Sequence, residues 1–276
     1  MTIAVAIKVR DGIVLAADSA TTLASGAGVA NVYDHANKIV NLCKGKPIGF
    51  MTWGLGGFGS ANIAMLAKDF REEVWPDKFN GSYTVEGVAS ELKDFLMPIG
   101  AATLPDVPEG QRGFGFLVAG DAPGHTAGDA WGHVWKVEVD AITGDWSEPE
   151  EVLPGEDGII WYGQPQWLQR LILGVDFDAA AVALVDRLGL DANLLPVILG
   201  AIRDEAQAAF HHPAMPIQDV INLGGFLVEV TKGAVMFAPG APTVGGPTEI
   251  AAITKHEGFK WVSRKHYFDR ILNPEG

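Results

Sequence analysis

The chain has 276 residues and a mass of 29.3 kDa, with 48% hydrophobic and 20% charged residues, so it can bury a large core and is not intrinsically disordered over most of its length. Asp and Glu outnumber Lys and Arg by 34 to 20, which gives a net charge of −14. This charge repels phosphate backbones and anionic lipid heads, so we expect no nucleic-acid partner and no membrane partner.

The first part of the chain predicts two hairpins. Runs of β-branched and small apolar residues predict strands over 2–10 and 13–18, joined by an Asp-Gly turn, and over 38–43 and 47–53. The polar stretch 19–37 between the pairs predicts a loop with a brief extended segment.

Two consecutive helices are expected next. Apolar residues recur at helical spacing from 63 to 74, where Trp75-Pro76 ends the first helix. Thr84 can cap a second helix that carries one apolar face as far as Leu96, with no strand between the two helices.

The rest of the chain predicts strands, then helices, then strands again. The predicted strands span 113–119, 133–140 and 159–162, the helical segments span 166–173, 179–188, 194–210 and 217–235, and the closing strands span 248–254 and 259–262. Hairpins that alternate with groups of helices favour an α+β fold over a parallel βαβ sheet. We expect a four-layer αββα sandwich, with two antiparallel sheets flanked by helices, formed as one domain by residues 1–276.

No cofactor and no metal site is predicted. The run Gly54-Leu55-Gly56-Gly57-Phe58-Gly59 matches a dinucleotide fingerprint, but the following helix leads into another helix and not into a parallel strand. The glycine-rich run is better explained as a turn whose backbone passes close to another group, and that group can be a substrate. The pair His211-His212, and His125 with His133, lack further ligands at metal-binding spacing, so structural roles are favoured for them.

The chain is expected in the cytoplasm. Cys43 is the only cysteine and cannot form an internal disulfide, which fits a reducing compartment. Lys8, Arg10 and Asp11 interrupt the first apolar run before it reaches the length of a signal-peptide core.

The amino terminus carries the strongest candidate chemistry. Methionine before a small residue is commonly removed, and removal of Met1 would leave Thr2 with a free α-amino group. An α-amino group has a pKa near ~7.7–8.0, so it can act as the base for the weakly nucleophilic hydroxyl of the same residue. Thr2 would then be nucleophile and base together.

The surrounding residues strengthen this interpretation. The segment TIAVAIK at 2–8, the segment DGIVLAADS at 11–19 and the segment NKI at 37–39 together resemble the amino-terminal region of proteasome β-type subunits. These are threonine peptidases of the N-terminal nucleophile (Ntn) hydrolase superfamily. Coarser similarities follow at Trp53-Gly54, along 135–140, and at Val244-Gly245-Gly246 before 250–253.

The resemblance implies the Ntn hydrolase fold and a set of roles. Thr2 would attack the scissile carbonyl, Lys38 would place a positive charge beside the threonine hydroxyl, and Asp18 would orient and balance Lys38. The backbone N–H of Gly54 would stabilise the oxyanion. Alternatively, Lys38 and Asp18 form an ordinary ion pair at strand ends.

The sequence also departs from the family. Gln164 follows Gly163 where the family has a serine, and Val244 lies in the stretch where the family has an aspartate and a serine, so we expect slow turnover or an altered pKa of the Thr2 amine. The helical region at about 174–239 is longer than usual for such subunits, and a short charged tail ends the chain.

The leading hypothesis is a hydrolase: a threonine-type endopeptidase that acts on peptides or unfolded protein through an acyl-enzyme on Thr2, in a self-compartmentalising homo-oligomeric ring. Whether an ATPase partner feeds it is not readable from the chain. Two alternatives stay open, a catalytically silent structural ring subunit of the same fold and an Ntn amidase that acts on a small molecule.

Overall fold

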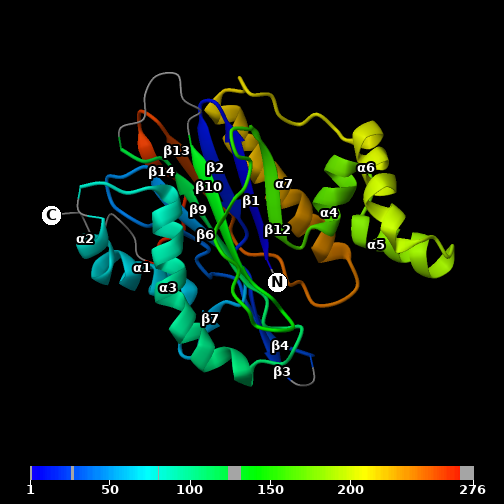
Figure 1. The fold of residues 1–276 in the computed structure, drawn as a ribbon, viewed down its shortest axis with the longest axis horizontal. Coiled ribbons are helices and arrows are strands. Elements are labelled where there is room, and N and C mark those ends of the chain that lie inside the picture. Colours follow the sequence, from blue (N-terminus) through cyan, green and yellow to red (C-terminus); the bar gives the residue numbers. More distant parts are fainter. Residues whose placement is uncertain (1, 26–27, 80, 124–131, 268–276) are drawn as a thin grey trace.

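The protein is an antiparallel sandwich flanked by helices. The computed structural model describes residues 2–25, 28–79, 81–123 and 132–267. Two five-stranded antiparallel sheets pack face to face at its centre, and helices cover their outer faces (Figure 1). The predicted α+β, four-layer αββα fold is therefore confirmed.

The first sheet contains the amino terminus. Its strand order is β12 (Gly158–Gly163), β1 (Ile3–Val9), β2 (Gly12–Ala17), β13 (Glu249–Thr254) and β14 (Gly258–Ser263). Each neighbouring pair is antiparallel, and the turn at Asp11-Gly12 closes the central hairpin. The start of the chain thus lies in the middle of a sheet, next to strands that come from its far end.

The second sheet is built from the middle of the chain. Its order is β11 (Glu150–Glu151), β10 (His133–Val139), β9 (Phe114–Gly120), β6 (Ile48–Gly54) and β5 (Ile39–Asn41). The short strand β11 is not predicted by the sequence pattern. Its two residues have no alternating apolar character, and their pairing with β10 defines them as a strand.

Two small hairpins lie outside the main sheets. They are β3 (Thr21–Ser25) with β4 (Gly28–Tyr33), and β7 (Gly57–Phe58) with β8 (Ala61–Asn62). The β3–β4 hairpin occupies most of the stretch for which the sequence predicts a loop, and it extends from one end of the sandwich (Figure 1). The sequence predicts only a brief extended segment within this loop, and the structure has a two-stranded hairpin instead, because neither strand shows the strict apolar alternation that predicts a strand.

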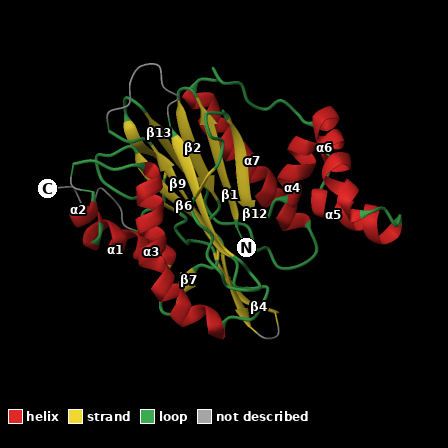
Figure 2. Ribbon diagram, viewed as in Figure 1, coloured by secondary structure: helices red, strands yellow, loops and turns green. Residues whose placement is uncertain are grey.

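Helices form the two outer layers (Figure 2). On the second sheet lie α1 (Ile63–Glu73), α2 (Trp75–Lys78) and α3 (Val85–Thr103), and on the side of the first sheet lie α4 (Gln166–Leu168), α5 (Phe177–Val182), α6 (Leu195–Ala206) and α7 (Ile217–Phe237). π-helical turns continue α4 over Gln169–Leu173 and α5 over Ala183–Arg187, and 3₁₀ turns span Leu104–Asp106 and Ala192–Leu194. Asn62 and Thr84 cap α1 and α3 through their side-chain oxygens.

Strand β1 shows how the layers meet. Its larger residues Ile3, Val5 and Ile7 belong to the core beneath α4 and α7, while Ala4 and Ala6 face the second sheet. Successive side chains of a strand point to opposite faces, so this alternation of large and small residues joins a helix-covered face to a closely packed sheet interface. Every residue of β1 is buried.

Helix α7 packs on the outer face of the first sheet. By length and composition alone it could cross a membrane. In the structure it runs along β1 and β2 and buries Val220, Leu227 and Val228 against them, with Gly224 close to Val14 and Ala16. This is the packing of a core helix.

Candidate active site

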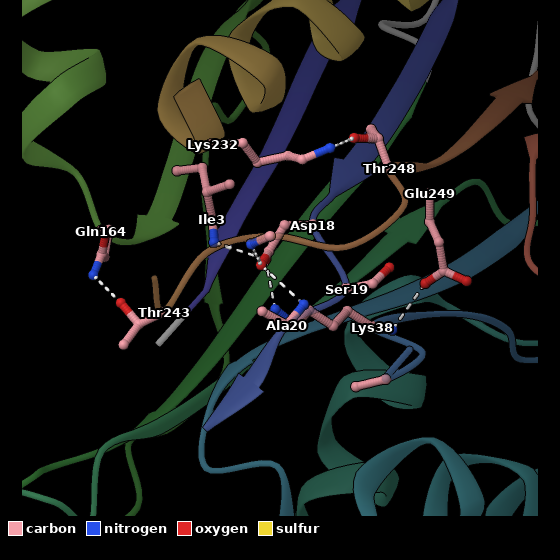
Figure 3. Close-up of polar contacts among 12 residues, drawn as sticks. Ile3, Asp18, Ser19, Ala20, Lys38, Gln164, Lys232, Thr243, Thr248 and Glu249 are labelled. Carbon is pink, nitrogen blue, oxygen red and sulfur yellow. Dashed lines mark hydrogen bonds and ion pairs between the residues drawn. The ribbon is translucent and has the colours of Figure 1, made fainter. Parts of the chain in front are cut away.

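The first hairpin brings Thr2 and Asp18 together. Strand β1 begins directly after Thr2, and β2 ends directly before Asp18, so the antiparallel register places both at one end of the sheet. The Asp18 N–H donates to the Ile3 carbonyl at 3.2 Å, and the Ile3 N–H donates to Asp18 Oδ1 at 3.0 Å. The Asp18 carboxylate therefore lies beside the peptide group that follows Thr2 (Figure 3).

Asp18 is fully buried and accepts four hydrogen bonds. Besides Ile3, the N–H groups of Ala20 and Gly245 donate to its Oδ2 at 3.1 and 3.0 Å. Lys38 Nζ lies 2.5 Å from its Oδ1. A buried carboxylate is tolerated when donors and an opposite charge compensate it, and this one has both.

Lys38 reaches the same point from the second sheet. It precedes β5, is 5% exposed, and shares the Oδ1 atom of Asp18 with the Ile3 N–H. Burial lowers the pKa of Lys38 from its usual value, and the charge and hydrogen bond of Asp18 oppose that shift. The ammonium group is thus held next to the head of β1 by one oxygen atom.

Thr2 faces a large cleft. The cleft has a volume of about 1520 Å³ and is lined by Thr2, Gly54 and Gly163 together with aromatic residues. Gly163 has a φ of +97°, and a Cβ there would lie 2.0 Å from the Thr2 carbonyl oxygen. Only glycine permits this close approach, which is locked by the hydrogen bond from the Gln164 N–H to that same oxygen at 2.8 Å.

Gly54 ends β6 at the edge of the cleft. Its φ is +82°, and a Cβ would lie 2.2 Å from the carbonyl oxygen of Gly113 on the neighbouring segment. The glycine-rich run therefore turns the backbone sharply beside the cleft, as the sequence suggests. The helix that follows it leads to no parallel strand among the described residues.

Aromatic side chains give the cleft an apolar wall. Trp53 and Tyr162 stack with ring centroids 4.1 Å apart and an interplanar angle of 8°. Burial raises the pKa of Tyr162 to about 12, so its hydroxyl stays neutral at physiological pH. The lining of the cleft combines Thr2 with a flat aromatic surface that can hold an apolar or extended substrate segment.

Comparisons with known proteins find similar solved structures but no similar sequence. A scan against protein-family models finds no match, and a sequence search of curated proteins finds none. Similar solved structures are Anbu (ancestral beta-subunit) proteins. Anbu from Yersinia bercovieri is 10% identical with a TM-score of 0.53, covering 96% of this chain and 88% of its own. The helical assembly of the Anbu complex from Pseudomonas aeruginosa is 13% identical with a TM-score of 0.55, covering 96% and 88%. Anbu from Hyphomicrobium sp. strain MC1 is 14% identical with a TM-score of 0.51, covering 98% and 91%.

These findings correct the family suggested by the sequence. The resemblance to proteasome β-type subunits was wrong in its family, because the similar structures are Anbu proteins. The two assignments share the Ntn-type fold, so the architecture is unaffected. The error has a physical origin: the motif rests on the hairpin, the Asp-Lys pair and the glycine turn, which build the site and do not distinguish between families of this fold.

The two departures noted in the sequence lie together. The Gln164 Nε2 donates to Thr243 Oγ1 at 2.9 Å, and Gln164, Thr243 and Val244 are all buried. An amide–hydroxyl pair thus stands near the start of β1, where the resemblance implies serine and aspartate side chains (Figure 3). Any tuning of the Thr2 amine would come from different groups.

Sequence reasoning missed two contacts of this site. Gly245 donates its N–H to Asp18, and Glu249 accepts the N–H of Lys38 at 3.0 Å. Both come from the far end of the chain. Gly245 lies in the Gly-Gly motif that the sequence singles out without assigning it a contact, and no local pattern signals the contact of Glu249 with Lys38. Of the histidines, His133 Nδ1 lies 2.6 Å from Glu151 Oε1, while His125 lies outside the described residues.

Proposed function

We propose that the protein is a hydrolase of the N-terminal threonine type, which cleaves amide bonds of peptides or unfolded protein through an acyl-enzyme on Thr2. One observation carries the proposal: a single oxygen of buried Asp18 joins the Lys38 ammonium to the peptide group next to Thr2, which lines a cleft. Burial of both charges at the head of a central strand carries a large desolvation cost, which favours a functional role over an ordinary ion pair at strand ends.

The proposed reaction needs a free Thr2 amine, which removal of Met1 would supply. The Thr2 hydroxyl proton passes to the α-amino group as Oγ1 bonds to the substrate carbonyl carbon, and the carbonyl oxygen becomes an oxyanion. The positive charge of Lys38 favours the developing alkoxide, and the Gly54 N–H is assigned to the oxyanion. The C–N bond then breaks, the proton goes to the leaving amine, and water hydrolyses the ester and restores Thr2.

Hydrolysis assays test the proposal. We expect purified protein to cleave a fluorogenic peptide, Thr2→Ala to lose cleavage, and Thr2→Ser to keep part of it, because serine retains both the hydroxyl and the amine. Peptide cleavage that persists unchanged in Thr2→Ala would overturn the proposal. Cleavage of a small-molecule amide but of no peptide would favour an amidase.

A second candidate is a catalytically silent subunit of the same fold. It is favoured by buried Val244 and by the Gln164 amide bound to Thr243, because hydroxyl and carboxylate groups that would tune the Thr2 amine are replaced there. An electrophilic peptide that never labels Thr2, in protein from which Met1 has been removed, would support this candidate.

Self-association into a ring is part of the proposal. Large apolar side chains are exposed on α5, α6, α7 and the turn that follows α5, namely Val182, Leu188, Val197, Met236 and Phe237. Exposed apolar surface of this kind is typical of interaction sites. A structurally similar Anbu protein is described as a helical assembly, so light scattering and electron microscopy should distinguish a closed ring, an open helix and a monomer.

We also propose one cytoplasmic domain over residues 1–276, with an enlarged helical region at about 174–239 and a short charged C-terminal tail. The interleaved strand order, with β1, β2 and β13 adjacent, supports one folding unit. A single cooperative denaturation transition is expected, and two separate transitions would contradict it.

A further inference from the structure

Behind the candidate site lies a buried carboxylate that the proposed reaction does not use. Glu249 is the first residue of β13 and is 1% exposed. Its Oε2 accepts the backbone N–H of Lys38 at 3.0 Å in a buried hydrogen bond (Figure 3). Glu249 therefore fixes the backbone from which the Lys38 side chain extends.

The charge on Glu249 is balanced by Lys265. Lys265 follows β14 by two residues, and its side chain is 12% exposed. Its Nζ lies 3.4 Å from Glu249 Oε1, donates to Ser19 Oγ at 2.5 Å, and donates to the Ala36 carbonyl. The three donors of the ammonium thus each have an acceptor, which is the arrangement that a buried lysine requires.

The contacts of Lys265 surround the candidate site. Ser19 directly follows Asp18, and Ala36 lies two residues before Lys38. The Ser19 hydroxyl also donates to the Pro247 carbonyl at 2.5 Å, and the Ala36 N–H donates to the Ser19 carbonyl at 2.9 Å. One lysine near the end of the chain therefore connects the segments that carry the aspartate and the lysine of the site.

We propose that Glu249 and Lys265 are positioning residues for Lys38: Glu249 holds its backbone, and Lys265, on the segment that follows the last strand, holds Glu249 and sets the charge around the Lys38 ammonium. The catalytic part of this inference rests on the proposed function. The structural and electrostatic part can be measured without any activity.

Glu249 and Lys265 shift the pKa of Lys38 in opposite directions. The charged groups that face Lys38 are Asp18 from the end of β2, Glu249 from β13 and Lys265 from the C-terminal segment. Asp18 and Glu249 raise the pKa of Lys38, whereas Lys265 lowers it. Loss of Lys265 should therefore raise the pKa of Lys38, and loss of the Glu249 charge should lower it further. A merely structural role would not produce opposite shifts.

The test is a lysine titration by NMR of protein labelled with ¹³C at lysine Cε, in which the Lys38 signal is identified by its absence in Lys38→Arg. We expect Lys265→Met to move the Lys38 titration to higher pH and Glu249→Gln to move it to lower pH. Lys265→Arg, which keeps the charge, should leave it near the wild-type position. Lys260→Met removes an exposed lysine of β14, the strand that precedes Lys265, and is the matched control with no shift.

The kinetic readout uses the same variants with a fluorogenic peptide. Displacement of Lys38 by a fraction of an ångström should reduce kcat by about 10- to 100-fold in Glu249→Gln and Lys265→Met, with little change in KM and with recovery in Lys265→Arg. Shifts of the same sign in both variants, or no shift in either, would overturn the proposal. If the wild-type protein cleaves nothing, the proposed function fails while the titration still decides the role of the pair.

Discussion

In the buried pair of Asp18 and Lys38, we expect the loss of Asp18 to lower the free energy of unfolding more than the loss of Lys38. Asp18 accepts four hydrogen bonds, two on each carboxylate oxygen, and three of them come from backbone N–H groups. In Asp18→Asn the amide NH₂ must replace one of these oxygens, so two buried donors lose their acceptor whichever way the amide is turned. In Lys38→Met the carboxylate keeps its three backbone donors.

The expected losses in free energy of unfolding follow from these contacts. Each unsatisfied buried donor costs about 1–3 kcal/mol, and removal of one partner from a buried ion pair costs about 3–5 kcal/mol. We therefore expect Asp18→Asn to reduce the free energy of unfolding by about 3–5 kcal/mol. Lys38→Met should reduce it by about 1–2 kcal/mol, because its loss leaves a carboxylate that still has hydrogen-bond donors. The double variant should lose less than the sum of the two, by about 1–3 kcal/mol.

Urea denaturation followed by tryptophan fluorescence measures these values. Lys78→Met is the control, because Lys78 forms an exposed ion pair with Glu91 and should change the free energy of unfolding by less than about 1 kcal/mol. The reasoning would be refuted if Lys38→Met cost more than Asp18→Asn, or if the two single losses were strictly additive.

Three further predictions follow from the geometry of the site. Gly54→Ala should lower the free energy of unfolding by more than about 1 kcal/mol and abolish cleavage, because its φ is positive and a Cβ meets the Gly113 carbonyl; unchanged urea denaturation would contradict this. Trp53→Ala should lower the free energy of unfolding by about 3–5 kcal/mol, since Trp53 is 8% exposed and stacks on Tyr162. A melting temperature equal to that of the wild type would argue against the stacked wall. Burial lowers the pKa of Lys38 in the folded chain below the 10.5 of the unfolded chain. Between the folded and the unfolded pKa, the unfolded chain binds more protons than the folded chain. The stability contributed by Lys38 therefore rises with pH up to 10.5 and is lost as pH falls. The difference in free energy of unfolding between wild type and Lys38→Met should therefore shift in favour of wild type from neutral pH to about 10, and a shift in the other direction would show that Lys38 is stabilised as a cation.

The fold could be predicted from the sequence because its signals are local. The Asp11-Gly12 turn and the apolar runs on either side define the first hairpin, and Thr84 marks a helix start that the structure retains. That hairpin alone brings Asp18 to the head of β1. The proximity of these positions was therefore accessible from residues 2–18.

Other parts of the site were not accessible. The Glu249 carboxylate acts on Lys38 across 211 positions, and Lys265 reaches Ser19 across 246. Both contacts depend on β13 pairing with β2, which no periodicity within either strand specifies. The catalytic roles of Thr2, Asp18, Lys38 and Gly54 stay predictions, since geometry shows where they lie and not what they do.

The family assignment failed for a related reason. Short motifs around a conformationally demanding site, such as the Gly54 turn, reflect what the fold requires. They therefore suggested the Ntn-type architecture correctly while pointing to proteasome β-type subunits instead of the Anbu-like structures that the whole chain resembles.

The chemical state of the first residues tests the account most directly. Intact mass and peptide mapping of purified protein, before and after incubation with a peptide epoxyketone, report both the removal of Met1 and the attachment of the inhibitor. We predict a chain that begins at Thr2 and gains one inhibitor on that residue, with no gain in Thr2→Ala. Met1 present on every molecule, or an inhibitor bound equally well to Thr2→Ala, would contradict a threonine nucleophile at this site.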